Sequence, residues 1–227
     1  MKNLKFIFVF VLISCFYGFC ITHSFSQNKT SKDIKREGGL YLLQGFRSQN
    51  FSQINTRLKS FDFTPSKEIT HVFGAGGYGW FGRFKVGGEG NYIQNTNKDN
   101  NKTTELQGFV GNIYTSYLLN PKSKIHILPL IGLGGESLIL SSNKNNSTAT
   151  SFSQALEQPQ TLQLKTGNFY LKTALQFEYK AQKSVMGFQV GYQYAPSQNW
   201  QIGTNSFDNA PSDNLSNFFL QFTFGLE

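Results

Sequence analysis

Large apolar side chains occupy every second position in several stretches of this chain. In the last stretch, Phe218, Leu220, Phe222, Phe224 and Leu226 alternate with residues that are mostly small or polar. Successive side chains of a β-strand point to opposite faces, so a period of two predicts a strand with one strongly apolar face. The same alternation recurs upstream, and the chain is therefore predicted to be all-β.

Eight stretches read as strands. They are residues 39–49, 69–80, 83–94, 105–119, 124–140, 162–180, 185–195 and 216–226. Long connections are expected at 50–68, 95–104, 141–161 and 196–215, and short ones at 81–82, 120–123 and 181–184. Strict alternation of long and short connections over eight strands is typical of an up-and-down barrel in an outer membrane, with the long loops outside the cell.

The two faces of each strand indicate what surrounds the barrel. In "NFYLKTALQFEYK", Phe169, Leu171 and Leu175 share one face, whereas Lys172 and Glu178 share the other. A soluble barrel would have to bury the charges and expose the large hydrophobic side chains, which is unfavourable on both counts. A membrane barrel reverses the arrangement. Its predicted interior polar network consists of Lys85, Glu89, Lys172, Gln176, Glu178, Gln189, Gln193 and Gln221.

Two predicted strands leave the assignment of faces open. In "LYLLQGFR", either face fits the outside, because Gln44 interrupts one and Arg47 the other. In "IHILPLIGLGGE" both faces are apolar, and we expect Ile131 and Leu133 to point outward and His126 inward.

The first residues read as an export signal. Lys2 and Lys5 precede an apolar run, and "SFS" then provides a small-x-small cleavage site after Ser26. The predicted division is a signal peptide at 1–26, a flexible segment at 27–37 and a barrel at 38–227. An uncleaved anchor helix and a lipoprotein start at Cys15 are the alternatives. Removal of 1–26 also removes both cysteines, so no disulfide is expected.

Composition narrows the possible partners. Cleavage removes two lysines and no acid, and the net charge falls from +8 to +6. The lysines are scattered through polar segments such as "NTNKDNNK" and do not alternate with aromatic residues along a strand. Neither a basic stripe nor a stacking platform is present, so no binding of nucleic acid is expected.

The chain resembles the small eight-stranded bacterial outer-membrane barrels represented by OmpX and the transmembrane domain of OmpA. The resemblance covers residues 38–227 and rests on the signal, the strand count, the alternating connections and the ending "FFLQFTFGLE". It implies an eight-stranded antiparallel transmembrane β-barrel, exported through the periplasm to the cell outer membrane and folded there by the barrel-assembly machinery. The Asn- and Lys-rich loops are similar in style to those of exported Bacteroidota proteins.

Motifs for catalysis and cofactors are weak. "GAGGYG", residues 74–79, matches the dinucleotide fingerprint but is followed by a strand where that fingerprint needs a helix. His71, with Glu68 three residues earlier, is the only candidate for a lipid-modifying barrel enzyme, and no G-x-S-x-G elbow accompanies it. No His, Asp or Glu cluster has metal spacing. We therefore expect no cofactor, no metal and no enzymatic activity.

The expected function is that of an integral outer-membrane protein with an envelope structural, adhesion or accessory-subunit role carried by its long loops. Its partners would be outer-membrane lipid and a larger outer-membrane complex. Amphipathic aromatic rings prefer the headgroup level. Trp80, Phe81 and Tyr117 are predicted at the periplasmic edge, and Tyr92 and Tyr194 at the outer edge. A lipid-modifying enzyme and a secreted soluble barrel that binds an apolar ligand are the alternatives.

Overall fold

The computed structural model describes residues 38–144, 161–181, 184–202 and 210–226. The predicted signal peptide and flexible segment lie outside these residues. Eight long strands follow one another along the chain, as predicted. They are β1 (Gly38–Gln49), β2 (Ile69–Phe81), β3 (Phe84–Asp99), β4 (Lys102–Tyr117), β5 (Ile125–Lys144), β6 (Thr161–Ala181), β7 (Ser184–Tyr194) and β11 (Asn217–Leu226).

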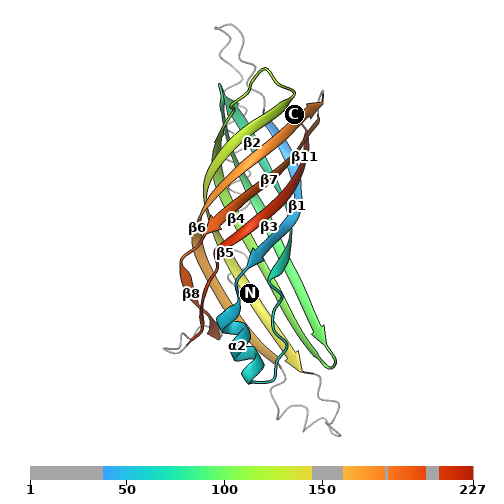
Figure 1. Ribbon diagram of the computed structural model, residues 1–227, viewed down its shortest axis with the longest axis vertical. Coiled ribbons are helices and arrows are strands. Elements are labelled where there is room, and N and C mark those ends of the chain that lie inside the picture. Colours follow the sequence, from blue (N-terminus) through green and yellow to red (C-terminus); the bar gives the residue numbers. More distant parts are fainter. Residues whose placement is uncertain (1–37, 145–160, 182–183, 203–209, 227) are drawn as a thin grey trace, which may run out of the picture.

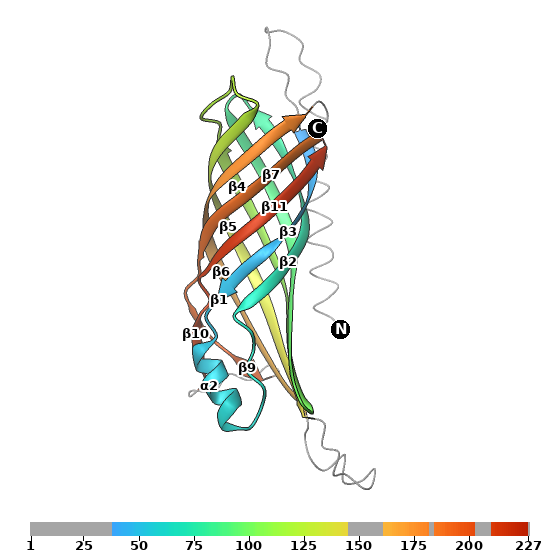
Figure 2. The ribbon, with the colours of Figure 1, turned by 45° about the vertical axis from the view of Figure 1, so that its right-hand side comes forward.

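The strands close into an all-antiparallel barrel (Figures 1 and 2). Each pairs with its neighbours in sequence, and β11 pairs with β1 to complete the ring. We call the end with the β2–β3, β4–β5 and β6–β7 connections the turn end, and the opposite end the loop end. The first residue of β1 and the last residue of β11 both lie at the turn end, because an even number of strands returns the chain to its starting side.

Inward-facing glycines make room for large interior side chains. An added Cβ at Gly76 would lie 2.5 Å from the ring of Tyr41, and one at Gly134 would lie 2.5 Å from the ring of Tyr170. The "GAGGYG" segment lies within β2, and a turn with Gly82 at φ +63° leads directly into β3. Gly74 and Gly76, on its inward face, therefore serve packing across the barrel.

The prediction of a long connection at residues 95–104 is wrong. Instead, β3 and β4 remain paired as far as Asp99 and Lys102, and Asn100, with φ 49°, turns the chain. Asparagine tolerates this left-handed conformation better than most residues. The polar composition that suggested a loop belongs to strands that continue beyond the rest of the barrel, and β5 and β6 are similarly long.

The loop end carries additional structure that the sequence did not predict. Helix α2 (Ser52–Ser60) lies in the connection after β1, and the short strands β8 (Ser197–Asn199), β9 (Gln201–Ile202) and β10 (Ser212–Asn214) lie in the connection after β7. β8 pairs with β10, and β9 pairs with the loop-end part of β6. We call these two connections, as far as they are described, the cap. Within the described residues, no helix is long and apolar enough to cross a membrane.

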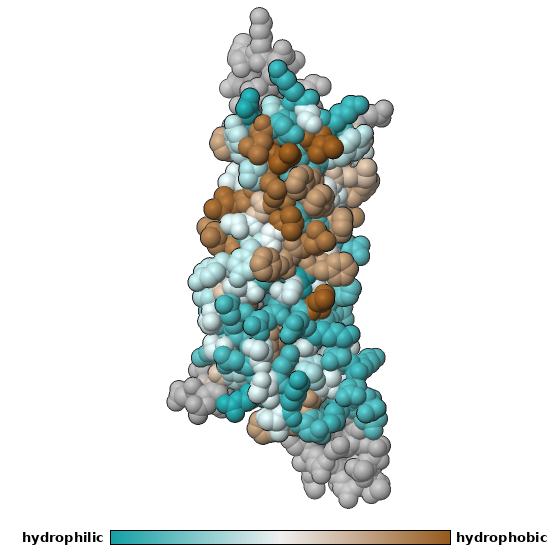
Figure 3. All heavy atoms as spheres, viewed as in Figure 1, coloured by the Kyte–Doolittle hydropathy of each residue, from teal (hydrophilic) through white to brown (hydrophobic). Residues whose placement is uncertain are grey.

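A belt of apolar side chains surrounds the barrel nearer its turn end. Figure 3 shows this belt in brown, with a long hydrophilic stretch between it and the loop end. Every strand contributes exposed hydrophobic side chains to it, including Leu42, Phe73, Val86, Ile113, Ile131, Phe169, Val190 and Phe222. Phe169, at 84% exposure, is the most exposed of them.

Candidate functional site

Three ion pairs fill the barrel interior. From the turn end to the loop end they are Lys85 with Glu178, Lys172 with Glu89, and Arg47 with Glu136. All six side chains are at most 4% exposed, and the pairs balance in charge. Buried charges are tolerated when they are paired and hydrogen-bonded, so the interior acts as a charged plug.

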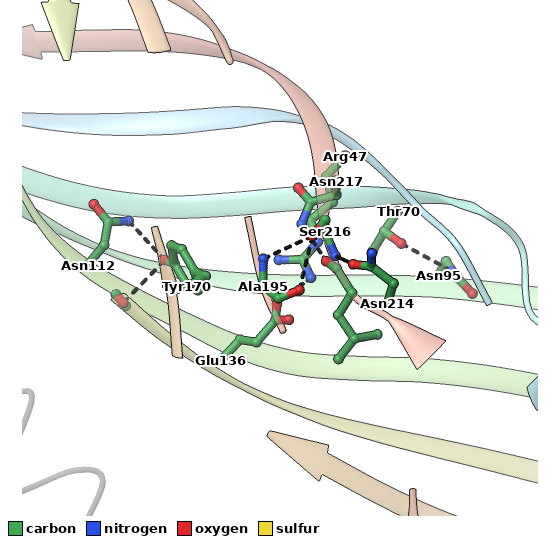
Figure 4. A network of polar contacts seen from close by, with 12 residues as sticks. Arg47, Thr70, Asn95, Asn112, Glu136, Tyr170, Ala195, Asn214, Ser216 and Asn217 are labelled. Carbon is green, nitrogen blue, oxygen red and sulfur yellow. Dashed lines mark hydrogen bonds and ion pairs between the residues drawn. The ribbon is translucent and has the colours of Figure 1, made fainter. Parts of the chain in front are cut away.

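The middle pair is the centre of a wider network. Asn112 donates to Glu89 at 2.9 Å, and the Tyr41 hydroxyl donates to the same carboxylate at 3.2 Å. Tyr41 also contacts the Tyr114 hydroxyl at 3.1 Å. The network reaches β6, because Asn112 donates to the Tyr170 hydroxyl at 3.2 Å (Figure 4). Side chains from β1, β3, β4 and β6 thus meet across the barrel axis.

The turn-end pair is closed by aromatic rings. Gln176 donates to Glu178 at 2.7 Å, and the Lys85 ammonium lies 3.8 Å from the centre of the Tyr78 ring. The Trp80 ring lies 5.7 Å from the same ammonium. Trp80 therefore faces inward, contrary to its predicted place at the membrane edge. It shares the inward face of β2 with Tyr78 because the strand alternates without a bulge, and the outward position passes to Phe81.

The structure places all eight residues of the predicted polar network inside the barrel, with exposures of 6% or less. Gln176, Gln189 and Gln221 form one row across β6, β7 and β11, where Gln189 lies opposite the other two in register. Gln193 lies opposite Lys172.

The loop-end pair was not predicted. Arg47 lies on β1, whose faces the sequence left open, and Glu136 lies on β5, where both faces looked apolar. The sequence did contain a signal for Glu136. His126 was expected to point inward, and Glu136 lies an even number of residues further along the same strand, so it shares that inward face. Figure 4 shows Arg47 and Glu136 meeting in the interior.

The two faces of the longest strands exchange polarity along their length. On β4 the outward residues change from Ile113 and Phe109 in the belt to Gln107 and Glu105 toward the loop end. The inward residues change in the opposite sense, from the polar Asn112 to Leu106, which is 0% exposed.

On β6 the same exchange runs from outward Leu175 and inward Lys172 to outward Gln163 and inward Leu164. One end of each strand has the arrangement of a membrane barrel, and the other end has that of a water-soluble protein. The change in polarity indicates a change of surroundings part-way along the barrel.

The cap has its own apolar core and a buried latch. Phe51, Ile54, Leu58, Trp200 and Leu215 are at most 2% exposed and belong to one cluster with inward side chains of β1–β6.

The latch is the carboxylate of Asp213. It accepts hydrogen bonds from the backbone N–H groups of Gln53 and Ile54, at 2.9 and 3.2 Å, and from the Trp200 indole at 3.0 Å. The first turn of α2 holds no acidic residue of its own, so Asp213 supplies the negative charge that a helix N-terminus favours. The two connections are thereby locked to each other.

A second, exposed contact holds the other end of α2. Asp62, with φ 62°, follows the helix and pairs with Lys102 of β4, and Lys144 of β5 lies 3.8 Å away. The hydrogen bond and charge of Lys102 hold the pKa of Asp62 below its usual value. Lys144 also donates to the Phe61 carbonyl.

Four of the predicted edge aromatics lie on the outer surface. Phe81 and Tyr117 lie at the turn end, where Tyr117 packs on Phe84 with ring centres 5.1 Å apart. Tyr92 and Tyr194 lie on the loop-end side of the belt, and Tyr92 packs on Phe109 at 5.3 Å.

The predicted catalytic histidine lies on the outer surface. His71 is exposed on β2, and its ring centre lies 4.9 Å from that of Phe46. His126 lies on the inward side of β5, in register with Glu178. Among the described residues, no group of three or more His, Cys, Asp or Glu side chains is arranged to hold a metal ion.

Comparison with known proteins shows likeness in structure only. No protein-family model matches the chain, and no curated protein matches it in sequence. Neisserial surface protein A (NspA) is similar with a TM-score of 0.53 and 8% identity, over 85% of this chain and 99% of that one. A major outer membrane protein from Thermus thermophilus is similar with a TM-score of 0.56 and 7% identity, over the same shares. At these identities the likeness shows the fold, which is that of the small eight-stranded outer-membrane β-barrels.

Proposed function

We propose that this protein is an integral outer-membrane barrel with a closed interior, which acts at the cell surface through its cap. The observation that carries the proposal is the exchange of polarity along β4 and β6. A protein surrounded only by water gains nothing from exposing Phe109, Ile113 and Phe169 while burying Lys172. A barrel that crosses a membrane and continues into water needs both arrangements on the same strands.

The proposed orientation places the loop end outside the cell. Small outer-membrane barrels have short periplasmic turns and longer extracellular connections. The belt then lies in the bilayer, Phe81 and Tyr117 lie near the periplasmic headgroups, and Tyr92 and Tyr194 near the outer ones. The loop-end parts of β3–β6 project from the cell with the cap on their inward side.

The interior supports a role in recognition rather than transport. Eight strands leave a lumen that side chains alone can fill, and here three ion pairs occupy it. The cap, by contrast, is a folded structure with a buried latch and not a set of loose loops. Adhesion to a surface or docking onto a larger envelope complex is the function that this arrangement serves, without enzymatic chemistry.

Membrane insertion is tested by two charge substitutions on the outward face of β6. Leu175→Arg places a charge within the belt, which costs about 2–4 kcal/mol in a transmembrane barrel. Gln163→Arg is the matched control on the same face beyond the belt, where a surface change stays within about 0.5 kcal/mol. The measurement is reversible unfolding in lipid vesicles. Equal effects of the two substitutions would contradict insertion, because a barrel surrounded by water exposes both positions.

The surface role is tested with cells that express the protein. Wild type and Trp200→Ala, which removes the largest buried side chain of the cap, are compared for binding to host or matrix surfaces and for conductance in planar bilayers. We expect lost binding in the variant and no channel steps in the wild type. Steady conductance by the wild type would contradict the closed interior, and unchanged binding would contradict the role of the cap.

A further inference from the structure

An open pocket of about 520 Å³ lies at the turn end, between the β2–β3 turn and the β4–β5 connection. Arg83 and Lys122 line it together with Leu119, Asn120, Pro121 and Ser123. Both cationic side chains come from exposed residues, and the exposed Lys124 follows close in the chain. The pocket therefore combines two cations with an apolar part.

The pocket is held in shape by hydrogen bonds of the backbone and of one amide. The N–H of Leu118 donates to the Arg83 carbonyl at 2.9 Å, which ties the two connections together. Asn120 donates to the Ile125 carbonyl at 2.6 Å and accepts from the N–H of Ile127 at 2.8 Å. A site organised in this way before binding loses little conformational entropy when a ligand arrives.

No described carboxylate neutralises these cations. The described acidic residues lie elsewhere: Glu89, Glu136 and Glu178 in the interior, Asp213 in the cap, and Asp62, Glu68, Asp99 and Glu105 toward the loop end. The charge of the pocket is therefore complementary to an anion. An arginine fork suits a phosphate in particular, because it presents paired N–H donors.

Apolar side chains continue from the pocket onto the belt. Leu119 is 54% exposed at the pocket, and the packed rings of Phe84 and Tyr117 lie where β3 begins and β4 ends. The Arg83 guanidinium lies 3.5 Å from the Tyr117 hydroxyl. In the proposed orientation this is the level of the headgroups in the periplasmic leaflet. A ligand with a phosphate head and an apolar tail matches both parts.

We propose that this pocket binds the headgroup of an anionic glycerophospholipid, such as phosphatidylglycerol, in the periplasmic leaflet. The phosphate lies against Arg83 and Lys122, and the acyl chains follow Leu119 and the Phe84–Tyr117 pair onto the belt. A free phosphate would leave the apolar part unused. The inference rests on the proposed membrane insertion.

The experiment counts lipids on the intact protein by native mass spectrometry after extraction from vesicles that contain phosphatidylglycerol and phosphatidylcholine in equal amounts. The test variant is Arg83→Gln/Lys122→Gln. The control is Arg57→Gln/Lys59→Gln, which removes the same charge from α2 at the loop end. Each basic residue near a membrane surface contributes about fivefold to anionic lipid binding, so the test variant is expected to lose about 25-fold in preference for phosphatidylglycerol. The control is expected to keep the wild-type preference.

Further arms separate the possible failures. A preference that persists in the test variant, or falls equally in the control, overturns the site. Glycerol phosphate that competes as strongly as phosphatidylglycerol also overturns it, in favour of a soluble anion. Lys122→Glu, a single change in an exposed connection, repeats the test if the double variant does not fold. Flotation with pure phosphatidylcholine vesicles reports insertion separately: failure to float refutes the proposed function as well, whereas flotation without lipid preference refutes this inference alone.

Discussion

The middle ion pair provides the most direct test of the closed interior. Lys172 and the side chain of Glu89 are both 0% exposed. Glu89→Gln keeps the size of the side chain but leaves one acceptor oxygen where Asn112 and Tyr41 each had their own, and the Lys172 ammonium loses its anion. Removal of one partner from a buried pair costs about 3–5 kcal/mol, because the remaining charge is neither solvated nor paired.

A second substitution separates the charge from the packing. Lys172→Met removes the other charge and keeps an unbranched chain in the space beside Phe219, whose ring centre lies 4.9 Å from the ammonium. Buried pairs that are replaced by uncharged side chains of similar volume are often neutral or stabilised by about 1–4 kcal/mol. We therefore expect the double variant to be more stable than Glu89→Gln, with a coupling free energy of about 2–3 kcal/mol.

The assay is reversible urea unfolding in lipid vesicles, followed by the fluorescence of the two tryptophans, Trp80 and Trp200. Asp62→Asn is the control, since it breaks an ion pair of which the acid is 76% exposed. If Glu89→Gln is no more destabilising than this control, water solvates the orphaned ammonium. The interior would then be hydrated, and the reasoning that closes it to solutes would be refuted.

Three further predictions concern the cap and the wall. Asp213→Asn weakens charged hydrogen bonds worth about 1.5–3 kcal/mol each, so amide exchange in the first turn of α2 should accelerate about tenfold or more while the belt strands stay unchanged; equal exchange in wild type and variant would contradict the latch. Lys102 lowers the pKa of Asp62. The stability that this ion pair contributes is therefore present above the unfolded pKa of about 3.9 and is lost as the pH falls through the lower folded pKa. The protection factors of the amides at the end of α2, which correct for the pH dependence of intrinsic exchange, should fall only in this acidic range, with no such step in Asp62→Asn. Gly134→Ala, whose Cβ would lie 2.4 Å from a backbone oxygen and 2.5 Å from a tyrosine ring, should cost about 1–3 kcal/mol or prevent folding. Gly90→Ala, with nothing within 4 Å, should unfold like wild type in the same urea titration.

Alternation predicted most strands of the barrel. All eight predicted stretches lie in strands, and most of them carry the period of two that a sheet with unlike surroundings on its two faces requires. In the stretch that became β5 both faces are apolar, so the flanking turns had to define it. In residues 169–179 the inward and outward sets agree with the structure position by position. Charged residues within an apolar alternation provided that signal, since a buried lysine needs a polar interior.

Tertiary contacts explain what the sequence did not reveal. The polar residues of 95–104 form strands because Asn95 and Asn97 donate to the carbonyls of Lys67 and Pro65, contacts that no local pattern encodes. Helix α2 is short and is stabilised by Asp213, which lies far along the chain. Trp80 was assigned to the membrane edge from its residue type, whereas the parity of β2 and the ammonium of Lys85 determine its direction.

The long strands reverse their hydrophobic parity without losing their register. On β4 the large apolar side chains lie at odd positions, Phe109 and Ile113, in the belt but at an even position, Leu106, beyond it. The pairing of β4 with β3 is continuous, so no bulge accounts for this change of face. The predicted strand at 105–119 already includes Leu106, so the polar composition of residues 95–104, and not the exchange, suggested a loop there. The same reversal is evidence in its own right, because a strand that keeps its register while its apolar face changes sides must pass from one solvent into another. In a barrel of this kind, an uninterrupted strand whose hydrophobic parity reverses marks the boundary of the apolar belt on the loop-end side.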